Sequence, residues 1–171
     1  MMIFVLGVMV ILSFLLQSSV LPYLAVGGIT PNLLLVLTAS FGLIRGKKTG
    51  LLVGFFSGVL VDIFFGPFYG FNALMLLITG YLCGHFHYIF YEEDIKLPMI
   101  TIVAADFLYG VVQYMIAFFL RGRFDIWHFL WRIIIPEVIY TLLLTIIFYP
   151  FFLSISRYVD AFIKRRENRI V

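Results

Sequence analysis

The stretch GLIRGKKTGLLVGFFSGVLVDIFFG, residues 42–66, places a small residue at nearly every fourth position. Glycines stand at positions 42, 46, 50, 54, 58 and 66, and Asp62 takes the remaining place. Positions four apart form one slowly drifting ridge on an α-helix, so the spacing predicts a helix surface that a second helix can approach closely. Such ridges matter most in a membrane, where apolar side chains gain little by leaving lipid for one another.

Two interpretations of this ridge are open. It packs against another helix of the same chain, or it forms a contact face for a different membrane protein. Gly80 and Gly84 repeat the four-residue spacing in a later apolar run. Because the ridge crosses the basic turn at residues 45–48, we do not expect all of it to lie on one straight helix.

The composition fixes the class of protein. Of 171 residues, 63% are hydrophobic and 12% are charged, whereas a soluble domain is about half apolar and about a quarter charged. This excludes a soluble enzyme, a disordered chain and a nucleic-acid-binding domain, although the net charge is +3. An integral membrane protein remains. The single cysteine, Cys83, excludes a disulfide framework and is expected to be a small packing residue.

The apolar runs predict an all-α membrane protein with six transmembrane helices in a single domain. The expected spans are residues 2–21, 31–44, 49–65, 71–91, 97–120 and 133–153. The second run is short, so a tilted span, a re-entrant segment and a helix continuing through Gly46 are all open. Pro136 is expected to kink the sixth helix, whereas the other prolines lie at or near span ends.

The basic residues predict that both termini lie inside the cell. Six spans in this orientation put nine cations on the inner side: Arg45, Lys47, Lys48, Lys96, Arg157, Lys164, Arg165, Arg166 and Arg169. The outer side receives Arg121, Arg123 and Arg132, together with the interfacial Trp127 and Trp131.

The tail, residues 154–171, reads as a basic amphipathic helix that continues the sixth span along the inner membrane surface. Its cations Lys164, Arg165 and Arg166 are candidates for contact with anionic lipid. The two interpretations are a simple positive-inside anchor and a site for an acidic cytoplasmic partner.

Three polar side chains stand within the later spans: Asp106, Gln113 and Glu137. Polar groups are expensive in hydrocarbon, so they are expected to face the bundle or water. Hydrogen bonding between helices is the first interpretation, and a proton or substrate path is the second. No metal ligand pair or catalytic motif is evident, so we expect no enzyme activity, metal or cofactor.

The ordered motifs resemble the MreD family of rod shape-determining membrane proteins. The resemblance is carried by PNLLL at 31–35, GLIRG at 42–46, GLLVGFFSGVLVD at 50–62, GFNAL at 70–74 and GYLCG at 80–84. Asn32 stands where the family often has Asp. With the resemblance, the candidate packing or partner-contact residues are Gly50, Gly54, Gly58, Asp62, Asn72, Gly80 and Gly84.

The resemblance implies a non-enzymatic scaffold of the cell-elongation machinery in the bacterial cytoplasmic membrane, supporting peptidoglycan synthesis and cell shape. Its expected direct partner is MreC, a single-pass protein. MreB, RodA and a penicillin-binding transpeptidase are expected through the complex. The family is also similar in fold to the substrate-binding subunits of energy-coupling-factor transporters. That similarity leaves a small-molecule-binding subunit of a vitamin-type transporter as the alternative.

Overall fold

The computed structural model describes residues 2–25, 28–66, 70–89, 96–121 and 130–167; of residues 117–121, 130, 163–164 and 166–167 it describes the backbone only. Every long element in these ranges is an α-helix. The helices are α1 (Met2–Ser19), α2 (Leu33–Arg45), α3 (Lys47–Phe64), α4 (Phe71–His85), α5 (Lys96–Arg121) and α7 (Ile135–Glu167). Short 3₁₀ turns, η1 (Leu21–Leu24) and η2 (Phe86–Ile89), and a π-helical turn, η3 (Leu130–Ile134), lie between them.

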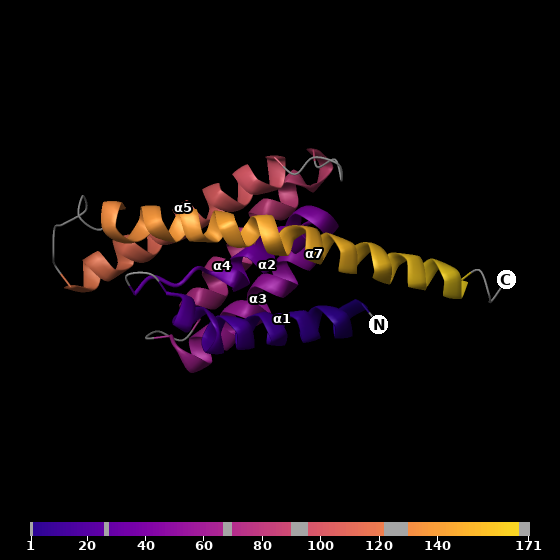
Figure 1. Ribbon diagram of the computed structural model, residues 1–171, viewed down its shortest axis with the longest axis horizontal. Helices are drawn as coiled ribbons and strands as arrows, with labels where there is room; N and C mark the ends of the chain where they lie inside the picture. Colours follow the sequence, from indigo (N-terminus) through magenta and orange to yellow (C-terminus); the bar gives the residue numbers. More distant parts are fainter. Residues whose placement is uncertain (1, 26–27, 67–69, 90–95, 122–129, 168–171) are drawn as a thin grey trace.

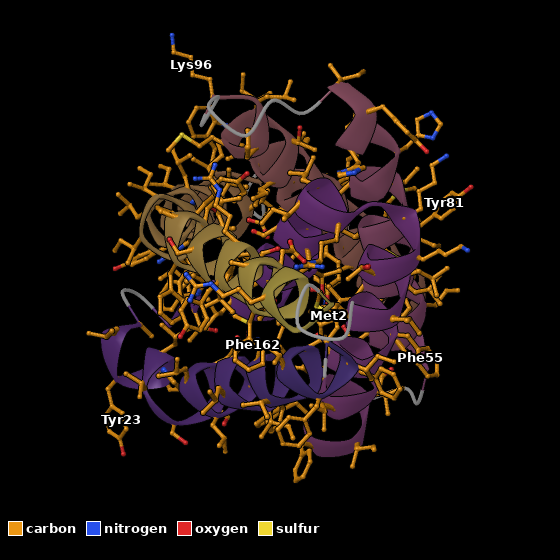
Figure 2. The ribbon with its side chains drawn as sticks, turned by 90° about the vertical axis from the view of Figure 1, so that its right-hand side faces the viewer. Met2, Tyr23, Phe55, Tyr81, Lys96 and Phe162 are labelled. Carbon is orange, nitrogen blue, oxygen red and sulfur yellow. The ribbon has the colours of Figure 1, made fainter. Side chains whose placement is uncertain are left out.

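Among the described residues, three segments are long and apolar enough to cross a membrane by length and composition. They are α1, the part of α5 from Lys96 to Ile116, and the segment Trp131–Phe162 of η3 and α7. Large apolar side chains also cover the outside of the bundle, as Figure 2 shows for Phe55 and Tyr81. The expected all-helical architecture is therefore confirmed over the described residues, and three of its helices are candidates for membrane spans. Six full spans and the inward position of both termini stay predictions, although N and C lie at the same end of the bundle (Figure 1).

The second predicted span is the centre of the bundle. All residues of α2 from Leu33 to Leu43 are buried, and α2 contacts α1, α3, α4, α5 and α7. This explains why its sequence is apolar apart from Thr38 and Ser40 up to Ile44, because a helix surrounded on every side needs no polar face. At 13 residues it is about 20 Å long, shorter than the hydrocarbon core of about 30 Å.

The side chains of Asn32 and Gln17 cap the N-terminus of this central helix. The Asn32 side chain is the N-cap and accepts a hydrogen bond from the backbone N–H of Leu35 at 3.1 Å. Gln17 reaches across from α1 and accepts from the N–H of Leu34 at 2.9 Å. Two of the N–H groups that a helix start leaves unbonded are thus satisfied inside the bundle.

Gly46 ends α2 and begins α3. Its φ of +85° lies in the left-handed region, which favours glycine. The chain turns there, so the expectation that one helix continues through Gly46 is wrong.

The last helix runs on past residue 153, where the sixth span was expected to end, into the tail. Residues 135–167 form one helix of 33 residues, about 50 Å long, and its C-terminal end extends past the other helices (Figure 1). Pro150 lies inside this helix, not at its end. The π-helical turn of residues 130–134 directly precedes the turn that holds Pro136, where a kink was expected.

Candidate functional site

The glycine ridge of α3 packs against α4. These two helices make the most extensive contact in the described structure. A Cβ added at Gly54 would collide with the carbonyl of Leu76, and one at Gly58 would collide with the backbone of Ala73. Gly50 and Gly80 approach each other in the same way. The two backbones therefore lie in direct contact along a seam in which only glycine fits.

The seam continues to α2 and to the first residue of α3. A Cβ at Gly42 would lie 2.7 Å from the carbonyl oxygen of Gly80, and one at Gly84 would lie 2.5 Å from the Cα of Lys47. Glycines 42, 50, 54, 58, 80 and 84 thus join α2, α3 and α4 into one tight unit, the glycine core. In this structure the ridge packs against another helix of the same chain, which is the first of the two interpretations. A partner helix cannot reach the ridge while α4 occupies it, so the ridge is not the direct contact face that we considered.

Asp62 closes the seam by capping α4. Its carboxylate accepts hydrogen bonds from the backbone N–H groups of Gly70 (3.0 Å), Asn72 (3.0 Å) and Ala73 (2.8 Å). A fourth bond comes from the side-chain amide of Asn72, at 3.0 Å. The side chain is 3% exposed. A helix start carries unbonded donors and a partial positive charge, so a buried carboxylate is well placed there. The sequence placed Asp62 on the ridge but gave no sign of this role.

Asn72 carries the polar contacts on to α5. Its side-chain oxygen accepts a hydrogen bond from the Tyr109 hydroxyl at 2.6 Å and a longer one from the Gln113 amide at 3.3 Å. The Gln113 amide also donates to the Tyr109 oxygen at 3.0 Å. A continuous network therefore runs from Asp62 on α3 through α4 to α5. In this structure Gln113 therefore forms hydrogen bonds between helices, which was the first of its two interpretations. Tyr109 takes part in the same network.

Asp106 and Glu137 occupy different environments. Asp106 is 2% exposed, and neither carboxylate oxygen makes a hydrogen bond with the described residues. Thr141 on α7 interacts with it, but the Thr141 hydroxyl does not complete a hydrogen bond of standard geometry. Glu137, one turn earlier on α7, is half-buried and lines a hollow with Asn72, Tyr109 and Gln113. The sequence grouped these two carboxylates, whereas only Glu137 borders this hollow.

Arg45 holds the other end of the bundle together. Its guanidinium donates to the hydroxyl of Ser156 at 2.8 Å and to the Ser156 carbonyl at 3.0 Å. It also pairs with Asp160 at 2.8 Å. The buried helix α2 is thereby fixed to the extended part of α7.

The tail cations are only partly described. Lys164, Arg165 and Arg166 all lie on α7. The Arg165 side chain is exposed, and those of Lys164 and Arg166 lie outside the described side chains. Within the described residues, no group of three or more His, Cys, Asp or Glu side chains is placed to hold a metal ion.

A family model described as rod shape-determining protein MreD matches residues 1–159, which is most of the chain. The chain belongs to the MreD family. This family is non-enzymatic, so the chain is a shape-determining membrane protein and not an enzyme. No curated protein and no solved structure gives a significant match. The expected similarity to transporter substrate-binding subunits therefore stays a prediction.

Proposed function

We propose that this MreD-family protein is a bilayer scaffold that binds MreC directly and, through it, the rest of the cell-elongation complex. Family membership supports a role in rod-shape determination. The observation that carries the scaffold proposal is the glycine core. Backbones in direct contact, closed by a buried cap, form a rigid unit with little freedom to open and close around a transported substrate.

The MreC contact is proposed on the outer face of α4 and α3, on the side away from the glycine core. Helix α4 has 15 residues and is about 22 Å long, so it falls short of a hydrocarbon core of about 30 Å. A helix shorter than the bilayer is stabilised when a neighbouring helix covers it. The outer face of α4 also presents a row of exposed large side chains: Leu74, Ile78, Tyr81 and Leu82.

The neighbouring part of α3 extends this face with two aromatic rings. Phe55 and Phe56 are 42% and 56% exposed, and their centroids lie 5.6 Å apart. In this proposal the glycine core acts indirectly. It brings α3 and α4 close enough that their outer side chains form one surface for a single transmembrane helix.

Co-purification of MreC with paired variants tests this face. Ile78→Ala with Leu82→Ala removes two exposed side chains, 42% and 51% exposed, one turn apart on α4. Ile139→Ala with Leu143→Ala removes a matched pair, 54% and 52% exposed, on α7. We expect the α4 pair to lower MreC recovery at least fivefold and the α7 pair to leave it unchanged, with both proteins folded. Equal recovery from the two pairs would remove this face from the proposal.

Depletion in the native rod-shaped cell tests the function as a whole. Rounded cells are the expected result, and full-length protein supplied from a plasmid should restore rods. A vitamin requirement without a change of shape would favour the transporter subunit instead.

A further inference from the structure

Among the described residues, three adjoining hollows of about 240, 400 and 270 Å³ lie near the end of α1, the start of α2 and the start of α7. Thr30 lines all three. Glu137 is shared by the first and second, and Gln17 and Phe65 are shared by the first and third. Together they reach the size range of small-molecule sites, about 300–1,000 Å³.

Hydrogen bonds within the protein fix which polar atoms the first hollow offers. The oxygens of Gln17 and Asn32 are taken by the starting turn of α2, which leaves their NH₂ groups as donors. The Gln113 NH₂ group is taken by Asn72 and Tyr109, which leaves its oxygen as an acceptor. The side chains are thus held in place before a ligand arrives, which lowers the cost of binding.

Glu137 gives the second hollow a carboxylate. It makes no hydrogen bond or ion pair with the residues that the structure describes, and it also lines the first hollow. A carboxylate attracts an ammonium group, and the remaining amide N–H groups of Gln17 and Asn32 in the first hollow can donate to phosphate oxygens. The polar lining therefore suits a zwitterion with a cation and an anion a few bonds apart.

The third hollow adds an apolar side. Phe14, Val61 and Phe65 are among its lining residues, and the Phe14 ring lies 5.9 Å from that of Phe65. A polar hollow beside an apolar one matches an amphipathic molecule, with its charged part at Glu137 and its hydrocarbon part at Phe14.

We propose that this connected site, the Glu137 site, binds the headgroup of an aminophospholipid, that is, a primary ammonium group joined to a phosphate. The ammonium donates to the Glu137 carboxylate and the Gln113 oxygen. The phosphate accepts from the amides of Gln17 and Asn32. The same chemistry occurs in free phosphoethanolamine, so the lipid and the soluble molecule are the two sources to separate. Choline headgroups carry no N–H and leave the acceptors of the site unpaired, which predicts strong discrimination against them.

Native mass spectrometry of the full-length chain with defined lipids tests the site. The probes are phosphatidylethanolamine, phosphatidylcholine and phosphatidylglycerol of identical acyl chains. We expect phosphatidylethanolamine to be retained at least tenfold better than either of the others. Equal retention of phosphatidylethanolamine and phosphatidylcholine would overturn the proposal.

Matched carboxylate variants locate the binding. Glu137→Gln should lower phosphatidylethanolamine retention at least fivefold and leave phosphatidylcholine unchanged. Glu137→Asp keeps the charge and should keep the preference. Asp160→Asn removes a half-exposed carboxylate at the opposite end of the bundle and should have no effect. If thermal unfolding shows that Glu137→Gln is folded and it still retains the lipid fully, the proposed site is wrong.

Competition with free phosphoethanolamine separates the two sources. Displacement of the bound lipid at millimolar concentration supports recognition of the headgroup chemistry alone. Retention of the lipid supports a site that also requires the acyl chains beside Phe14. Neither result depends on MreC, so these experiments test the Glu137 site independently of the scaffold function.

Discussion

Replacing Asp62 by alanine should destabilise the bundle more than any surface substitution. The carboxylate accepts four hydrogen bonds, three of them from the backbone at the start of α4. Losing a helix cap costs about 1 kcal/mol, and each buried donor left without a partner costs about 1–3 kcal/mol. Water from the adjoining hollow that borders Asn72 can satisfy some of these donors. We therefore expect a loss of about 3–4 kcal/mol in unfolding free energy.

Asp62→Asn sharpens this prediction. The amide keeps one acceptor oxygen but turns an NH₂ group toward donors, so we expect a loss of about 2 kcal/mol. The control is Asp160→Asn, which removes the half-exposed member of the ion pair with Arg45 and should cost under about 1 kcal/mol. Unfolding in mixed micelles of dodecylmaltoside and dodecylsulfate measures the change in unfolding free energy for Asp62→Ala, Asp62→Asn and Asp160→Asn. If Asp62→Asn is no more destabilised than Asp160→Asn, the capping role is refuted.

Three further predictions concern the seam, the α2–α7 contact and the buried carboxylate. Gly54→Leu should lower the unfolding free energy by at least about 3 kcal/mol, because the new side chain meets the backbone of α4. Gly7 has open space around it, so Gly7→Leu should be nearly neutral in the same assay. Similar losses of stability from the two variants would contradict the seam. Arg45→Gln should speed hydrogen exchange in the last turns of α7 several-fold, and unchanged exchange would mean that Arg45 does not hold this segment. Asp106→Asn should raise the unfolding free energy by about 1 kcal/mol, because a buried carboxylate that no described residue hydrogen-bonds costs more than an amide. A clear loss of stability would show that the carboxylate has a partner.

The sequence predicted the helical membrane class and the tight packing of the glycines, because both follow from local composition and spacing. A glycine at every fourth position indicates close approach whatever the neighbour is. It does not say which helix approaches, since that depends on the path of the whole chain. The contact between Gly58 and Ala73 exists only because the chain reverses between α3 and α4.

The polar side chains were harder to interpret for the same reason. Asp62 looked like the end of a partner-binding ridge, yet its four donors come from residues 70–73, which a one-dimensional pattern does not connect to it. Gln17 accepts a hydrogen bond from Leu34 at the start of α2, 17 positions away, and no local pattern around Gln17 predicts this contact. Asp106, Tyr109 and Gln113 are spaced three and four positions apart and therefore share one face of α5. Within the described residues, however, the network joins Tyr109 and Gln113 to Asn72 and leaves Asp106 out.

Site-specific photo-crosslinking in living cells tests the central claim most directly. A photoreactive residue at position 78, on the outer face of α4, should form an adduct with MreC, and one at position 143 on α7 should not. Adducts from position 143 but not from position 78 would contradict the proposed contact face. If neither position nor any other outward position yields MreC, direct binding itself is contradicted.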